Sequence, residues 1–395
     1  MELSSSSYVL IAIALIIIIG YVGIAIFKRT KIPEVLILML IGVLIASTGN
    51  LLSVNTISTL RSFAPLFGSL ALVVIMYNGS KRLKLDNKLM NLKGIAIGVL
   101  DTVLATVAVS ALMHFMLGWP LIYGAILGAI LGETSNIVVI PIIQRVDISE
   151  DIHNTLFMET TINSVLAIVM FSVLLIYLNT QAISVFASVN YILDYVGVAV
   201  FIGIVAGLIW MYVISAIGVA RDYLATIAIA LLLYGIVDVF NGAAIISVLI
   251  FGIMIGNYGI FANIFKLNTK VRRKGELHVE KSLEFIITTF FFVFMGMIMV
   301  LSLQYFVYGL VVVAVLILIR YFTSMTALHN NTPQDRGLFF ALMPRGVTVA
   351  TLASILYGMG GIYFTQTFYI SFIIIAITSI VSSMLLYTIK LDIKK

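Results

Sequence analysis

Thirteen predominantly apolar stretches succeed one another along this chain, separated by short segments in which charges, glycines and prolines gather. A helix that crosses a bilayer needs about 20 such residues, with some tolerance for shorter or tilted helices. The stretches therefore predict thirteen membrane-spanning helices in one all-α membrane domain over residues 1–395. Their approximate bounds are 8–27, 33–47, 63–79, 93–117, 120–145, 153–178, 189–215, 222–240, 242–258, 283–303, 305–326, 334–357 and 366–390.

The composition agrees with a bilayer as the main solvent and excludes several classes of function. Hydrophobic residues make up 62% of the chain and charged ones 10%, against about 25% charged in a soluble domain. The absence of cysteine excludes thiolate chemistry and disulfides, and four scattered histidines do not make a zinc site. Because the sequence contains no nucleophile–base pair or phosphate-binding loop, we expect neither an enzyme nor a metal or cofactor.

Lysine and arginine predict the orientation, because cytoplasmic loops of membrane proteins carry the excess of both. With the N-terminus outside and the C-terminus inside, 20 of the 23 basic residues fall in inner loops. Arg61 falls outside, and Arg320 and Arg345 lie within spans. The net charge of +6 is therefore an orientation signal rather than a nucleic-acid patch. We expect a multi-pass protein of the plasma membrane.

The predicted spans repeat with an offset of 212 to 214 residues, as spans 1 and 8, 4 and 11, 5 and 12, and 6 and 13 show. The offset predicts a first repeat over 8–178, a linking helix over 179–221 and a second repeat over 222–390. Since equivalent helices lie an odd number of spans apart, the second copy is inserted upside down. Inverted repeats are typical of secondary transporters, whose sites lie near the midplane of the membrane.

Spans 5 and 12 are interrupted by helix-breaking residues at corresponding positions. Span 5 contains GETSN at 132–136, with Pro141 beyond, and span 12 contains PRG at 344–346. Proline removes a backbone hydrogen bond, and unwound backbone at membrane depth is tolerated where it faces protein or a wet cavity. Each interruption taken alone could be an ordinary proline kink. The two together predict crossed, broken helices whose freed ends face an ion.

Ionisable residues within the predicted spans are candidates for the site, since a charge at mid-bilayer costs at least about 2.5–3.5 kcal/mol. Arg345 lies near the middle of span 12. Arg320 is nearer the inner end of span 11, where its side chain could also snorkel to the interface. Glu133 belongs to the span 5 interruption, and Asp101 and Asp238 are weaker candidates.

Span 6 carries a stripe of side-chain oxygens. Glu159 and Asn163 are four residues apart and share a helix face, and Thr160 and Ser164 form the adjacent row. Such oxygens suit a hard monovalent cation, Na⁺ or K⁺, although Ser, Thr and Asn also hold membrane helices together. Because a glutamate lies in the same stripe, we favour an ion site.

A further group of acids, Glu276, Glu280 and Glu284, lies in the long inner loop at the start of span 10. These residues share a helix face with basic neighbours. That pattern predicts a solvated or regulatory surface helix.

The chain resembles the monovalent cation:proton antiporter superfamily, the sodium/proton exchanger group, over almost its whole length. Members typically have a Thr-Asp-Pro-like break in span 5, a Glu-Ser-x-x-Asn/Thr-Asp motif in span 6, an arginine in span 11 and an Arg-Gly break in span 12. The matching positions here are Thr134-Ser135-Asn136, Glu159-Thr160-Thr161-Ile162-Asn163-Ser164, Arg320 and Met343-Pro344-Arg345-Gly346. The composite is specific, although no single motif is.

The resemblance implies how these residues act. Thr134 and Thr160 would ligate the ion, Glu159 and Arg320 would form a structural ion pair beside Asn163, and Arg345 would compensate the dipoles where the broken helices cross. The resemblance also implies a homodimer in which a core bundle of spans 4–6 and 11–13 slides against a dimer-forming scaffold of spans 1–3 and 8–10.

One position departs from the family pattern and bears on the mechanism. The aspartate for which Na⁺ and H⁺ compete in the family falls on Ser164, and a common span 3 acid falls on Asn78. A serine hydroxyl can ligate a cation but does not titrate near neutral pH. Either another carboxylate carries the proton, with Glu133 the first candidate and Glu159 the second, or the coupling is altered or lost.

These observations predict a secondary transporter that exchanges Na⁺ or K⁺ for H⁺ by elevator-type alternating access. Its expected ion ligands are Thr134, Thr160, Asn163 and Ser164. Two alternatives stay open: a transport-incompetent relative that acts as a sensor or scaffold, and an uncoupled cation uniporter or channel. Besides a second copy of the chain, the expected partner is the lipid bilayer and not nucleic acid.

Overall fold

The computed structural model describes residues 14–18, 20–23, 34–47, 54–83, 91–143, 146, 148–180, 185–217, 223–240, 242–267 and 276–389. Within these ranges the regular elements are helices and no strand occurs, which confirms the all-α fold class. The helices are α2 (Glu34–Ser47), α3 (Val54–Arg82), α4 (Leu92–Leu117), α5 (Leu121–Leu131), α6 (Asn136–Ile143), α7 (Glu150–Thr180), α8 (Val185–Ile217), α9 (Tyr223–Val239), α10 (Ala244–Gly256), α11 (Tyr258–Ile264), α12 (Glu276–Ile298), α13 (Leu303–Ala327), α14 (Pro333–Ala341), α15 (Val347–Met359) and α16 (Ile362–Thr388).

Several helices have the length and apolar composition of membrane spans. Five of them qualify individually, and they are Leu92–Leu117, Glu150–Leu178, Leu193–Ala216, Leu303–Ala327 and Ile362–Thr388. A sixth candidate is the pair α10 and α11, which bends by 79° at Asn257, and several shorter apolar helices accompany them. The count of thirteen spans and their orientation stay predictions, and the first predicted span falls partly outside the described residues.

Capping residues mark the ends of two helices of the core region, α4 and α14. Asn91 caps α4 by accepting a hydrogen bond from the backbone N–H of Gly94 at 3.0 Å. The same helix ends at Gly118, whose φ of 66° favours glycine. Thr332 caps α14 by accepting from the N–H of Asp335 at 3.1 Å, and Pro333 occupies the first turn.

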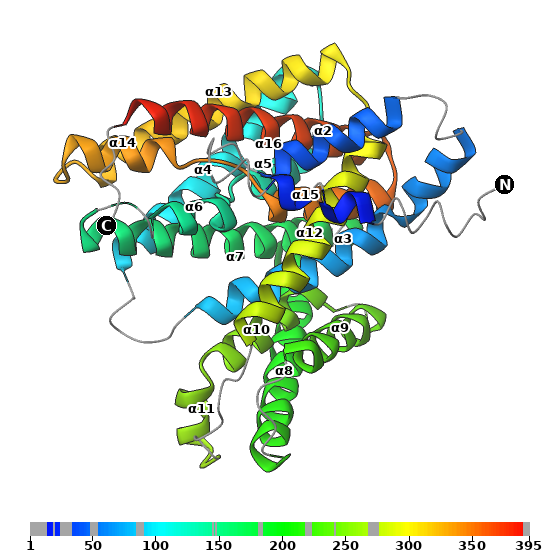
Figure 1. Ribbon diagram of the computed structural model, residues 1–395, viewed down its shortest axis with the longest axis vertical. Helices are drawn as coiled ribbons and strands as arrows, with labels where there is room; N and C mark the ends of the chain where they lie inside the picture. Colours follow the sequence, from blue (N-terminus) through cyan, green and yellow to red (C-terminus); the bar gives the residue numbers. More distant parts are fainter. Residues whose placement is uncertain are drawn as a thin grey trace.

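We divide the helices into two groups that contact each other, since α3 of one packs against α15 of the other. We call α4–α7 and α13–α16 the core bundle, in which α4 packs against α5, α7 and α13, and α16 packs against α13 and α15. We call α2, α3 and α8–α12 the scaffold. There α12 packs on α2, and α10 packs on α3 and α8. Figure 1 shows α8, α9 and α11 at the end of the molecule away from α13 and α16.

Glycines bring α5 close to α4 and so position the interruption that follows α5. A Cβ atom on Gly128 would lie 2.7 Å from the carbonyl oxygen of Ala105, and one on Gly132 would lie 2.8 Å from Cα of Thr102. Small residues of this kind let membrane helices approach backbone to backbone. The end of α5 is therefore held against α4, where Asp101 lies.

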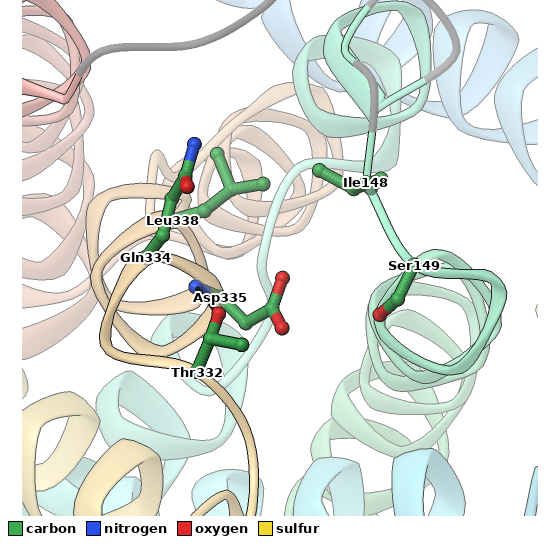
Figure 2. A pocket seen from close by; sticks show the side chains of 6 residues that line it. All are labelled: Ile148, Ser149, Thr332, Gln334, Asp335 and Leu338. Atoms are coloured by element: carbon green, nitrogen blue, oxygen red, sulfur yellow. Dashed lines mark hydrogen bonds between the residues drawn. The ribbon is translucent and has the colours of Figure 1, made fainter.

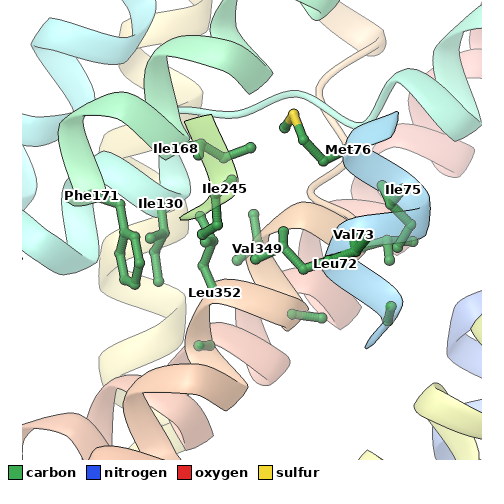
Figure 3. Close-up of a cluster of buried hydrophobic side chains, with 14 of the residues drawn as sticks. Leu72, Val73, Ile75, Met76, Ile130, Ile168, Phe171, Ile245, Val349 and Leu352 are labelled. Atoms are coloured by element: carbon green, nitrogen blue, oxygen red, sulfur yellow. The ribbon is translucent and has the colours of Figure 1, made fainter. Parts of the chain in front are cut away.

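The core bundle and the scaffold meet along an apolar seam, which is shown in Figure 3. The scaffold contributes Leu72, Val73, Ile75 and Met76 of α3 and Ile245 of α10. The core bundle contributes residues of α5, α7 and α15, which are Ile130, Ile168, Phe171, Val349 and Leu352. All ten residues are buried, so the contact between the two groups is made here by dispersion and apolar burial rather than by hydrogen bonds.

The prediction of a solvated helix at the start of span 10 was wrong for Glu280. Its side chain is buried and pairs with Lys81 of α3, with Nζ and Oε2 2.9 Å apart. Glu284, one turn later, accepts a hydrogen bond from Asn78 of α3 at 3.1 Å. The charges that the local sequence suggested for solvent therefore face another helix of the scaffold.

Candidate functional site

The two interruptions of the core bundle touch each other. The first separates α5, which ends at Leu131, from α6, which begins at Asn136. The second separates α14, which ends at Ala341, from α15, which begins at Val347. The backbone N–H of Ser135 donates to the carbonyl oxygen of Pro344 at 2.8 Å, so the two unwound segments are joined directly. Both interruptions lie at the residues where the sequence predicts them.

Gly346 permits this close approach, because any Cβ there would overlap the side chain of Ser135. We expect Gly346→Ala to lower stability by about 1–3 kcal/mol, the usual cost of overpacking. The measurement is the apparent melting temperature of the detergent-purified protein. Adding Ser135→Gly should recover most of the loss, since it removes the overlapping atoms. Equal melting temperatures for the single and double variants would contradict this account.

Arg320 of α13 forms the centre of a buried charge network. Its Nη1 lies 2.8 Å from Oδ2 of Asp101 in α4 and 2.9 Å from Oε1 of Glu159 in α7. Its Nη2 donates to the carbonyl oxygen of Leu342 at 2.8 Å, and the guanidinium stacks 3.7 Å from the ring centre of Phe339. Arg320 is 2% exposed, which rules out the snorkelling alternative.

Asp101 is the member of this network that sequence reasoning ranked too low. It lies nine residues from the start of α4, and Arg320 lies seven residues from the end of α13. At about 1.5 Å per residue the two positions differ in depth by only about 3 Å, if both helix ends lie at the predicted inner surface. Comparing depths between spans could therefore have found the pair.

Glu159 collects hydrogen bonds as well as the charge of Arg320. Its Oε1 accepts from Nδ2 of Asn163 at 2.7 Å and from the hydroxyl of Thr134 at 3.2 Å. Glu159 and Asn163 are fully buried. The carboxylate therefore links α7 with the first interruption and with α13.

Arg345 lies in the second interruption and reaches the first. Its Nη1 donates to the carbonyl oxygen of Glu133 at 2.5 Å and to the hydroxyl of Thr134 at 3.1 Å. Its backbone N–H donates to the hydroxyl of Thr378 in α16 at 3.1 Å. A positive charge thus lies beside carbonyls that the end of α5 leaves without helical partners, where cations are favoured.

Glu133 and Ser164 face each other across the first interruption. The Ser164 hydroxyl lies 3.3 Å from Oε1 of Glu133 and 2.8 Å from the carbonyl oxygen of Thr160. Glu133 is 1% exposed, and its Oε2 has no hydrogen-bond partner among the described residues. The same is true of Oδ1 of Asn163. A buried oxygen without a partner costs free energy unless a proton or cation reaches it.

A cavity of about 410 Å³ opens at one end of the core bundle. Figure 2 shows Thr332, Asp335 and Leu338 around the start of α14, opposite Ile148 and Ser149, which precede α7. Gln334 completes the lining. Leu338 is followed by Phe339, the residue on which Arg320 stacks, so α14 runs from the cavity to the charge network.

A family model described as sodium/hydrogen exchanger, transmembrane, matches residues 11–389 of the chain. The chain belongs to the sodium/hydrogen exchanger family. Members are integral membrane transporters rather than enzymes, and they exchange Na⁺ and H⁺. A comparison with curated proteins found no match.

The fold of this exchanger is similar to that of the sodium proton antiporter MjNhaP1 from Methanocaldococcus jannaschii. A structure of that protein at pH 8 has a TM-score of 0.78 and 19% sequence identity, covering 96% of this chain and 100% of the other. A second structure, from an electron microscopy map, has a TM-score of 0.70 and 23% identity, covering 98% and 96%. At these identities the likeness concerns the fold.

The structure of the exchanger brings most of the predicted site residues into one network. Thr134, Glu159 and Asn163 are joined by hydrogen bonds, and Glu133 pairs with Ser164. The Thr160 hydroxyl does not join this side-chain network, because it donates to carbonyl oxygens of its own helix, those of Leu156 and Phe157. The roles of all these residues in ion binding and proton coupling stay predictions.

Proposed function

We propose that this exchanger moves a monovalent cation, Na⁺ or K⁺, against protons, and that the two compete for the carboxylate of Glu133. The observation that carries the proposal is the position of Glu133 in the first interruption, hydrogen-bonded by Ser164, with a buried oxygen that lacks a partner among the described residues. Thr134, Asn163 and Ser164 supply neutral oxygens nearby. Thr160 joins them only if its hydroxyl turns from the helix backbone.

The charge balance of the network favours one ion at a time. Glu133, Glu159 and Asp101 are three carboxylates, and Arg320 and Arg345 are two guanidiniums, so the fully ionised network carries a charge of −1. Buried charge is costly unless it is balanced. One proton or one monovalent cation restores neutrality, whereas both together leave a surplus positive charge. Competition between the two ions, which is the basis of antiport, follows from this balance.

Ser164 does not prevent this chemistry, because its hydroxyl lies against the carboxylate that replaces the family's aspartate in our proposal. The acid is supplied from the first interruption and the hydroxyl from α7. Glu159 is less suited to exchange a proton, since Arg320, Asn163 and Thr134 hold its charged form. We therefore assign Glu159 and Arg320 a structural role, and Arg345 the compensation of the helix ends.

Elevator-type movement of the core bundle is the proposed mechanism of access. The apolar seam supports it, because the residues labelled in Figure 3 are Leu, Val, Ile, Met and Phe, whose side chains form no hydrogen bonds that sliding would break. The cavity of Figure 2 is the proposed vestibule on the inner side. In this assignment Asp335 faces the arriving cation.

The wider architecture is also a proposal. Helix α4 begins at Leu92 and α13 at Leu303, 211 residues later, and α7 begins at Glu150 and α16 at Ile362, 212 later. These offsets support two inverted repeats. We retain thirteen spans, crossed broken helices, an outer N-terminus, a homodimer formed through the scaffold, and residence in the plasma membrane.

A flux assay on the purified protein tests the proposal. In proteoliposomes that contain a pH-sensitive dye, an inward Na⁺ or K⁺ gradient should drive protons out. One-for-one exchange moves no net charge, so an imposed membrane potential of about 100 mV should leave the rate unchanged. If each cycle instead moved one net charge, that potential would change the driving force by about 2.3 kcal/mol, and the rate would respond. Protein-free liposomes are the control. Conductance without proton movement would indicate a uniporter, and no transport at all a sensor or scaffold.

A further inference from the structure

A second group of polar and charged residues lies in the scaffold, outside the site described above. We call Asn78, Lys81, Tyr223, Glu280 and Glu284 the scaffold cluster. In addition to the contacts of Glu280 and Glu284, the hydroxyl of Tyr223 in α9 donates to Oδ1 of Asn78 at 3.2 Å. Lys81 also lies over the Tyr223 ring, with Nζ 5.6 Å from its centre. The cluster joins three helices of the scaffold, and the exchange mechanism above does not use it.

Glu284 is an ionisable residue in an apolar helix, since it lies within the apolar part of α12 over residues 282–298. Such a residue within the membrane is by default a candidate functional site. Thr288 lies one turn further along the same face of α12. It is 5% exposed, and its hydroxyl has no hydrogen-bond partner among the described residues. A carboxylate and an oxygen that lacks a partner therefore follow each other on one face.

The scaffold cluster reaches the core bundle beside the first interruption. Gly79 follows Asn78 in α3, and it is partly exposed although residues 71–78 and 80 are all buried. A Cβ atom on Gly79 would meet only Nδ2 of Asn136, at 3.7 Å, within a 4 Å radius. Asn136 is the first residue of α6, three positions after Glu133. The surface of α3 at Gly79, next to Glu284's partner Asn78, is therefore less closely covered than the residues around it and faces the start of α6.

We propose that Glu284 and Thr288 of α12 form an accessory cation-binding station beside Asn78 and Gly79 of α3. The cation passes this station on its way between the predicted inner face and Glu133. Carboxylate and hydroxyl oxygens are ligands that hard cations accept. A stationary carboxylate at the mouth of a low-dielectric path raises the local concentration of cations. This inference rests on the proposed exchange at Glu133.

A station that the cation passes, but that takes no part in the exchange, affects affinity rather than the maximal rate. In everted membrane vesicles, which expose the inner face, we expect Glu284→Gln to raise the apparent KM for Na⁺ about tenfold, because it removes the charge that concentrates cations at the station. Thr288→Val should raise it about threefold, the effect of one lost neutral ligand. Maximal rates should change by less than about twofold, since Glu133 is untouched.

Two further variants separate this role from a structural one. Thr289→Val is the matched control, because Thr289 faces Gly20 on another side of α12, and it should leave the KM at the wild-type value. Asn78→Asp adds a negative charge and should lower the KM, whereas structural damage would not reverse the sign. If Glu284→Gln does not fold, the KM values of Thr288→Val and Asn78→Asp still test whether the station binds the cation.

Wild-type KM values for Thr288→Val and Asn78→Asp, with exchange intact, would overturn the station and leave the exchange at Glu133 standing. Absence of cation-dependent proton flux in the wild type would instead overturn the proposed exchange itself. The two failures are therefore distinguishable in one series of vesicles.

Discussion

Replacing Glu133 with glutamine is expected to reduce cation-dependent proton exchange to the level of protein-free liposomes. Glutamine keeps the size of the side chain and its hydrogen bond with Ser164, but it has neither a charge for the cation nor a site for the proton. The network of two arginines and two remaining carboxylates is then already neutral. Proton flux in proteoliposomes under a Na⁺ gradient is the measurement.

Two controls sharpen this result. Ser164→Ala removes one hydrogen bond but keeps the Glu133 carboxylate, so exchange should persist with a changed KM. The double variant Glu133→Gln/Ser164→Asp moves the carboxylate across the 3.3 Å contact between the two side chains, and it should recover exchange. Full exchange in the Glu133→Gln single variant would contradict the assignment and turn attention to Glu159.

Replacing Arg320 with glutamine should cause the largest loss of stability among single changes at the site. The variant leaves Asp101 and Glu159 buried near each other without their shared cation. Removing one partner of a buried ion pair costs about 3–5 kcal/mol. The expected result is a markedly lower apparent melting temperature of the purified protein, together with poor yield from the membrane.

The matched control is Arg336→Gln, which changes a partly exposed arginine of α14 and should have little effect. A compensated variant tests the cause directly. Combining Arg320→Met with Asp101→Asn and Glu159→Gln removes the charges together, and it should recover much of the lost stability, since uncharged residues of similar volume often replace buried ion pairs. A melting temperature for Arg320→Gln equal to that of the wild type would refute the charge network as a stabilising element.

Features determined by neighbouring residues were predictable from the sequence. The interruptions of α5–α6 and α14–α15 lie where glycine and proline weaken the helix, so composition sufficed to place them. The face shared by Glu159 and Asn163 follows from helix geometry, and the structure joins their side chains at 2.7 Å.

Features that depend on distant partners were not predictable in this way. Glu280 and Glu284 looked solvated because their partners Lys81 and Asn78 lie 199 and 206 residues away in the sequence. Arg320 admitted a snorkelling alternative because its partner Asp101 is 219 residues distant. Burial of a charge depends on which helices pack together, and the pattern within one helix does not contain that information.

The apolar seam has a consequence for the resting cell. Protons move through protein along continuous chains of hydrogen-bonded water, and such chains need polar groups to hold them. No polar side-chain group is present on the seam residues Leu72, Met76, Ile130, Phe171 and Leu352. Where these residues meet, the boundary along which we propose that the core bundle slides offers protons no polar path. We therefore expect the resting exchanger to conduct no protons along this stretch, and so to leave the proton gradient of the cell intact.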